Sequence, residues 1–177
     1  MKKLMIASAI AMTMAAGSAM AAGQQSEVQF LGLVTSVTCD ISSSVNGNAT
    51  NIVQLGSTSA GNSATPVNFT LKAQDPTASG CTALGTKTAT ITFQGPLGVN
   101  GLENGAGNAT NAYVELKTLN GKTNPEQAIK KGSNSVVFEG SKLISGGGYQ
   151  FQAKLVSGAG GSEGTFDSAL AYAVTYQ

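Results

Sequence analysis

The stretch that decides the fold is at the C-terminal end of the 177-residue chain, where residues 164–176 have the sequence GTFDSALAYAVTY. Period-two alternation of apolar and polar residues is typical of a β-strand with one buried face. The stretch therefore predicts a long C-terminal strand whose alternate positions face the core. Because the alternation continues to the penultimate residue, we expect this strand to form a sheet edge that invites pairing with another chain. The alternate positions are Phe166, Ser168, Leu170, Tyr172, Val174 and Tyr176.

The same alternation recurs along the chain, in runs separated by turn-forming clusters of Gly, Asn and Pro. About seven or eight short strands with such punctuation predict an all-β, immunoglobulin-like sandwich. Shorter strands are predicted at residues 52–55, 113–119 and 136–138, and one helical turn at 124–131, because Pro125 suits a helix start. The longer alternating series are Val28, Phe30, Gly32, Val34; Val67, Phe69, Leu71; Ala89, Ile91, Phe93; and Tyr149, Phe151, Ala153, Leu155.

The N-terminal residues have the order of a secretory signal peptide. Lys2 and Lys3 precede an apolar run at residues 4–16, and small residues follow up to Ala21. We therefore expect residues 1–21 to be removed. A retained membrane anchor is the alternative, but the run is shorter than the roughly 20 apolar residues that a spanning helix needs. We expect no membrane span in residues 22–177, which are long enough for one domain with its own core.

Composition argues against an enzyme and against nucleic-acid binding. The chain has no His, which removes the commonest general base and metal ligand, and it has no Arg for phosphate contacts. Without residues 1–21, eight lysines stand against nine acids, a net charge of about −1 that attracts no polyanion. Glu163 and Asp167 are the only close carboxylates, and we interpret them as solvated charges. We predict no catalytic residues, no metal site and no cofactor.

Cys39 and Cys81 are the only cysteines. In a protein exported to an oxidising compartment, two cysteines most simply form one disulfide bond. Two free thiols are the alternative. If both cysteines are bridged, no thiolate nucleophile remains.

Both ends of the chain resemble the chaperone-usher pilins of Gram-negative fimbriae, close to the major subunits of type 1 and K-antigen fimbriae. Residues 28–34, VQFLGLV, followed by Cys39, look like the alternating N-terminal segment of that family with its Gly at position 32. Residues 45–48 with Leu55-Gly56 are similar to the loop of the K-antigen type. Gly164, fourteenth from the end, and the penultimate Tyr176 match the ends of the family's chaperone-recognition strand.

The resemblance implies an immunoglobulin-like sandwich that lacks its final strand, formed by residues 39–177. A periplasmic chaperone would lend a strand and hold the C-terminal carboxylate, and at an outer-membrane usher the N-terminal segment of another subunit would replace it. Residues 22–38 would be that donor segment, with the chain exported through the periplasm into a surface fimbria of identical or related subunits. The donor residues would be Val28, Phe30, Gly32 and Val34. The recognition strand would use Gly164, Phe166, Leu170, Tyr172, Val174 and Tyr176.

Three functional hypotheses follow for the whole chain. The first is a structural pilin that polymerises and supports adhesion to host surfaces. The second is a minor or tip subunit that itself binds a host glycan, which the absence of Trp disfavours because no indole ring is present to stack on sugar. The third is a periplasmic enzyme, disfavoured by the lack of His. Gly32 has its own alternative, a β-bulge in an ordinary first strand.

Overall fold

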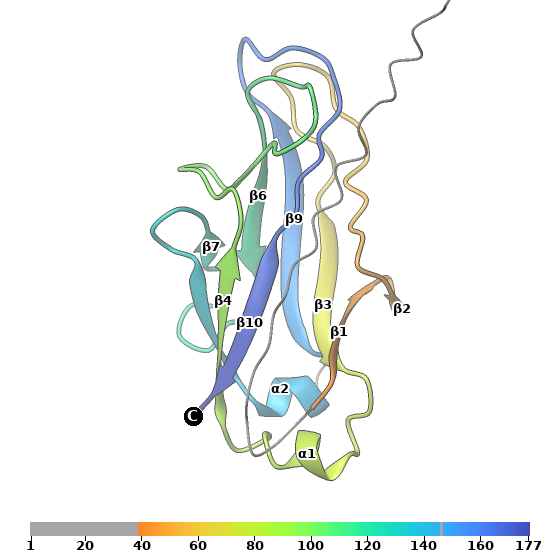
Figure 1. Cartoon of the computed structure of the whole chain (residues 1–177), viewed down its shortest axis with the longest axis vertical. Helices are drawn as coiled ribbons and strands as arrows, with labels where there is room; N and C mark the ends of the chain where they lie inside the picture. Colours follow the sequence, from red (N-terminus) through yellow and green to blue (C-terminus); the bar gives the residue numbers. More distant parts are fainter. Residues whose placement is uncertain (1–38, 146) are drawn as a thin grey trace, which may run out of the picture.

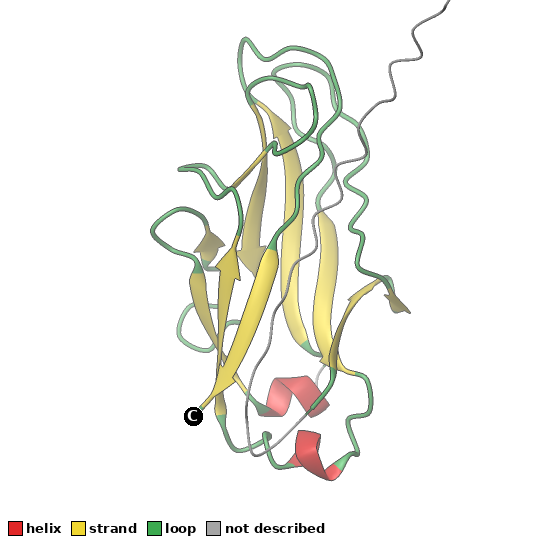
Figure 2. Cartoon of the chain, viewed as in Figure 1, coloured by secondary structure: helices red, strands yellow, loops and turns green. Residues whose placement is uncertain are grey.

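The computed structural model describes residues 39–145 and 147–177. Strands dominate these residues, and two short helices lie together at one end of the molecule (Figure 2). No helix in the described ranges is long and apolar enough to cross a bilayer. The elements are β1 Ile41–Val45, β2 Asn48–Ala49, β3 Val67–Ala73, α1 Ser79–Thr82, β4 Thr88–Gln94, β5 Leu102–Glu103, β6 Ala112–Thr118, β7 Ala128–Ile129, β8 Ser135–Glu139, α2 Ser141–Ile144, β9 Tyr149–Ser157 and β10 Ala171–Tyr176.

The strands form two antiparallel sheets that pack face to face (Figure 1). Sheet A has the order β2-β1-β3-β9-β6-β5, with β7 also paired to β6. Sheet B has the order β10-β4-β8. The all-β, immunoglobulin-like sandwich predicted from the sequence is confirmed, with sheet B much narrower than sheet A.

An aromatic cluster joins the two sheets at the centre of the core. Phe151 of β9 stacks on Phe69 of β3, with ring centroids 5.1 Å apart. From sheet B, the rings of Phe93 and Phe138 meet Phe151 edge-on, at 5.7 and 5.4 Å. Such pairs each contribute about 0.5–1.5 kcal/mol beyond the burial of their area. This cluster therefore fixes the two sheets against each other.

Strand predictions that rested on alternating large apolar residues are confirmed. The series at residues 67–71, 89–93 and 149–155 lie in β3, β4 and β9, and the shorter runs at 113–119 and 136–138 lie in β6 and β8. In β4, Ala89, Ile91 and Phe93 are all buried while the threonines between them are partly exposed. The series beginning at Val28 lies outside the described residues.

Two local predictions are wrong, and three elements were missed. Residues 52–55 form no strand, and Ile52 is 69% exposed. Residues 124–131 form no helical turn, because the Thr118 side chain holds this segment as a turn: its hydroxyl donates to the Pro125 carbonyl at 2.7 Å and accepts from the Gln127 N–H at 2.9 Å. The helices α1 and α2 and the strand β1 were not anticipated.

The disulfide predicted between Cys39 and Cys81 is confirmed. The two Cα atoms lie 4.7 Å apart, and 42 positions separate the residues in sequence. The bond ties the beginning of β1 to α1, and Cys81 is buried in the core. In the chain-entropy model, closing a loop of this size stabilises the fold by about 4 kcal/mol.

The C-terminal strand is shorter than the sequence predicts, because only Ala171–Tyr176 pair in a sheet. Residues 164–170 are instead bound to the loop at 104–110. Asn104 Nδ2 donates to the Thr165 carbonyl at 3.1 Å, and its Oδ1 accepts from the Asp167 N–H at 2.9 Å. Asn108 Oδ1 also accepts from the Thr165 N–H, at 2.6 Å. Backbone N–H groups of Gly105, Ala106 and Ala109 also donate to the Asp167 and Thr165 carbonyls, so the loop, with its asparagine side chains, takes the place of a neighbouring strand.

Replacing Asn104 with Ala should loosen this attachment. The variant removes the side-chain acceptor of the Asp167 and Gly107 N–H groups, so we expect faster amide hydrogen exchange at residues 165–168 and a loss of about 1–3 kcal/mol in the free energy of unfolding. Hydrogen exchange with mass spectrometry and denaturant unfolding measure the two effects. Asn100→Ala, at a side chain with no hydrogen bond to the described residues, is the control. Unchanged exchange at 165–168 in Asn104→Ala would contradict the role given to this side chain.

Candidate functional site

The edge of sheet B formed by β10 is the first part of the candidate site. Among the described residues β10 pairs with β4 alone. Beyond the end of the ladder, the Gln177 N–H donates to the Thr88 carbonyl at 3.0 Å and the Thr88 N–H to the Gln177 carbonyl at 2.8 Å. Hydrogen-bonded pairs alternate along an antiparallel ladder, so the N–H and C=O groups of Tyr172, Val174 and Tyr176 point away from β4. They can pair with a further strand.

The β1 edge of sheet A lies on the same side of the sandwich. In Figure 1, β10 lies between β4 and β9 in the view, and β3 and β1 lie beyond β9 on the side away from β4. β2 pairs with β1 only at Ser44 and Val45. Because sheet B has three strands and the hydrogen-bonded path of sheet A has six, the inner face of sheet A extends past β10. Along one long side of the molecule, the part of sheet A formed by β3 and β1 therefore has no described strand of sheet B opposite it.

Partly buried apolar side chains gather along these two edges. They pack against the core but keep part of their surface exposed, unlike the fully buried residues of β4 and β8. Tyr172 bridges the edge and the interior, with its ring centroid 6.4 Å from that of Phe93. From β1, β3 and the 53–55 segment the set comprises Ile41, Val53, Leu55 and Phe69; from the C-terminal segment it comprises Phe166, Leu170, Tyr172 and Tyr176.

The residues predicted for the recognition strand fall into two groups. Tyr172, Val174 and Tyr176 lie in β10 on its inward-facing positions, and Val174 is buried. Phe166 and Leu170 precede the strand but also pack against the core, and Gly164 lies beside Asn108 and Ala109, where a Cβ atom would clash. From Phe166 to Tyr176 the predicted positions are the less exposed ones, except that Ala171 between them is also buried; Gly164 is exposed, and the strand is not continuous. The role of these residues in recognition stays a prediction.

Two tyrosine hydroxyls lie between the sheets close to this edge. The oxygens of Tyr149 in β9 and Tyr176 in β10 are shielded from solvent, and among the described residues neither has a partner other than the facing hydroxyl of the pair. Burial, and then the nearby Tyr176 hydroxyl, raise the pKa of Tyr149 well above its usual range, and burial also raises the pKa of Tyr176. Both groups therefore stay neutral at physiological pH. The sequence pointed to each tyrosine separately but gave no sign that they meet.

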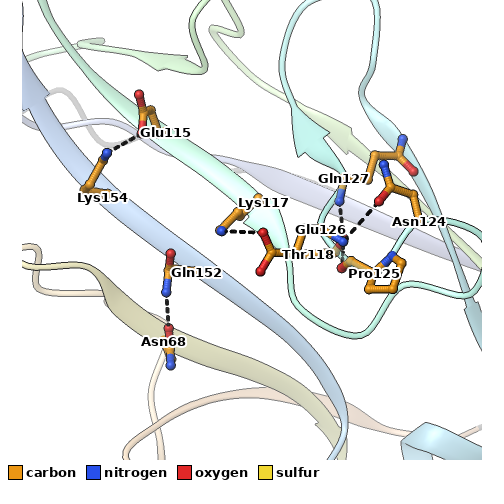
Figure 3. A network of polar contacts seen from close by, with 10 residues as sticks. All are labelled: Asn68, Glu115, Lys117, Thr118, Asn124, Pro125, Glu126, Gln127, Gln152 and Lys154. Carbon is orange, nitrogen blue, oxygen red and sulfur yellow. Dashed lines mark hydrogen bonds and ion pairs between the residues drawn. The ribbon is translucent and has the colours of Figure 1, made fainter.

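The outer face of sheet A differs from this edge in being polar and paired (Figure 3). Lys154 and Glu115 form an ion pair at 2.6 Å, Lys117 and Glu126 one at 2.9 Å, and Gln152 donates to Asn68 at 3.0 Å. Within the described ranges no three acidic, Cys or His residues cluster as a metal site would require. This face presents satisfied charges and no arrangement of catalytic groups.

The predicted donor residues Val28, Phe30, Gly32 and Val34 lie outside the described residues, as do the signal peptide at 1–21 and the whole 22–38 segment. Their assignment stays a prediction.

Comparison with known proteins gives the family. No family model matches the chain. The F107 fimbrial protein of Escherichia coli is 40% identical over 177 residues, which span all of both chains. The K99 fimbrial protein of Escherichia coli is 28% identical over 99% of each chain. The crystal structure of the P pilus rod subunit PapA aligns with 86% of this chain and 100% of its own, at 21% identity and a TM-score of 0.48. The full-length match to the F107 protein means that this chain belongs to the fimbrial proteins, and that it is a subunit of surface fimbriae and not an enzyme.

Proposed function

We propose that this chain is a structural fimbrial subunit that polymerises by accepting a β-strand from another subunit along the β10 edge. The observation that carries the proposal is the free edge itself: outward N–H and C=O groups on Tyr172, Val174 and Tyr176, beside partly exposed apolar side chains on both sheets. Strand addition at such an edge combines main-chain hydrogen bonds with pockets for alternate side chains. The added strand would extend sheet B and cover β3 and β1.

The donor would be the 22–38 segment of a second copy. Its alternating residues Val28, Phe30 and Val34 would point into the core, and each buried side chain contributes about 1.5–3 kcal/mol, or roughly 5–9 kcal/mol together. Gly32 would occupy a position where the backbone approaches closely and no side chain fits. Before assembly, the same edge would be covered by a strand of a periplasmic chaperone, and the exchange would take place at an outer-membrane usher.

A glycan-binding role remains the alternative. A hollow of about 280 Å³ beside β6 is lined by Asn100, Asn111 and Tyr113, among other residues, and Val99 at its rim is 70% exposed. An aromatic ring with neighbouring amides is suited to a sugar. The hollow is separate from the β10 edge, so receptor binding there would be compatible with polymerisation.

Charge placed on the inward face of the C-terminal segment should prevent assembly. Leu170→Asp would bring a carboxylate into the apolar lining, where an unpaired charge is costly, so we expect fibre yield to fall at least tenfold and periplasmic subunit to be degraded. Ala169→Asp, one residue earlier on the exposed face, should assemble normally. The two variants are compared by immunoblot, which quantifies the fibres sheared from the cells and the subunit in the periplasm. Equal fibre yields from the two variants would count against the proposal.

The donor segment is tested with synthetic peptides of residues 22–38. A native peptide should exchange into the chaperone-bound subunit. A peptide carrying Gly32→Val should exchange at least tenfold more slowly, because its β-branched side chain would enter a site that has no room for a side chain. Exchange is followed by native electrophoresis or mass spectrometry. No exchange by the native peptide would reject the donor role of 22–38, whereas equal rates would reject the role of Gly32.

A further inference from the structure

The buried hydroxyls of Tyr149 and Tyr176 are not fully hydrogen-bonded by the described residues of the single subunit. The Tyr149 side chain is completely buried, with its ring 4.7 Å from that of Phe138. Among the described residues, its oxygen and that of Tyr176 are shielded from water and have no partner other than each other. When two hydroxyls bond each other, one O–H donates and the other O–H has no acceptor, which costs free energy comparable to a lost hydrogen bond. Phenylalanine would fill the same space without this cost, so the packing of the single subunit does not explain why tyrosines are there.

The position of the pair suggests what completes it. Tyr149 is the first residue of β9 in sheet A, and Tyr176 is the last residue of β10, the edge strand of sheet B. The hydroxyls are therefore contributed by both sheets, at one end of the edge along which a further strand would pair. A strand added to β10 would run beside Tyr176. A polar side chain near one end of that strand would then come within reach of both oxygens.

The donor segment carries such side chains at both of its ends. Counting by twos from Val28, Phe30, Gly32 and Val34, the next positions are Ser26 before the series and Ser36 after it. In a strand, these serines face the same side as the apolar residues. Whichever direction the strand takes, one serine lies toward the end of the sandwich that holds the tyrosine pair. A serine hydroxyl both donates and accepts, which matches two phenol hydroxyls.

We propose that the Tyr149–Tyr176 hydroxyl pair is a polar recognition site in the strand-accepting edge, which binds a serine hydroxyl, of Ser26 or Ser36, from the donor strand of a second copy. The proposal rests on the proposed function and adds to it a determinant of register. A shift of register costs little where apolar side chains contact one another. It costs more where a hydroxyl has two buried partners in one register and none in the next. The pair therefore selects one alignment of the incoming strand.

A double-mutant cycle on fibres of the full-length chain tests the proposal. The variants are Tyr149→Phe, Ser26→Ala, Ser36→Ala and the two combinations with Tyr149→Phe, and the measurement is the rate of subunit loss from purified fibres in guanidinium chloride. We expect Tyr149→Phe and one serine variant each to speed dissociation about fivefold or more, and the combination to be no faster than either alone. Thr70→Val, which removes a hydroxyl from the outer face of β3, should leave the rate unchanged.

Several outcomes would overturn the proposal. If the tyrosines hold only an ordered water, the serine variants and Tyr149→Phe will change the dissociation rate independently. Their fold-changes will then multiply in the combined variants. An unchanged rate in Tyr149→Phe would also reject the site. If Tyr149→Phe subunits do not assemble, the same double-mutant cycle is measured with Tyr176→Phe, in the edge strand β10. Failure of the underlying function is recognised separately, because the native 22–38 peptide would then not exchange into the wild-type subunit at all.

Discussion

The rest of the structure depends on one constraint: sheet B has three described strands, and the edge strand β10 directs half of its backbone groups away from its partner β4. Beside that edge, Tyr172, Tyr176, Ile41 and Phe69 cover the core only in part. An open edge next to apolar surface invites association with another chain. In the function that we propose, this edge is the contact through which the subunits polymerise.

The side of the sandwich formed by the β10 and β1 edges is held at both ends by contacts within the chain. At one end the disulfide between Cys39 and Cys81 fixes the start of β1 against α1. At the other end Asn104 and Asn108 bind the segment that leads into β10. Between them, the cluster around Phe151 sets the distance between the sheets. A surface that is already ordered loses less entropy when a strand binds, so this arrangement favours tight association.

The sequence predicted those parts of the fold that large apolar side chains determine, such as β4 and β9, because period-two alternation of Ile, Phe and Tyr is a local signal. It did not predict β1, whose central residues are three serines with no hydrophobic pattern; pairing with β3 places that strand. Residues 164–170 alternate as a strand does, but backbone groups and asparagine side chains of the distant 104–110 loop bind them in place of a ladder. The Tyr149–Tyr176 pair depends on how two sheets pack, which no local pattern encodes.

Site-resolved amide hydrogen exchange in intact fibres tests the central claim most directly. The N–H groups of Ala171, Ala173 and Thr175 point toward β4, whereas those of Tyr172, Val174 and Tyr176 point to the free edge. If a strand from another subunit completes sheet B, both sets will be protected to a similar degree in the fibre. Fast exchange at Tyr172, Val174 and Tyr176, with protection confined to the other three, would mean that the edge stays open in the fibre and would contradict the account.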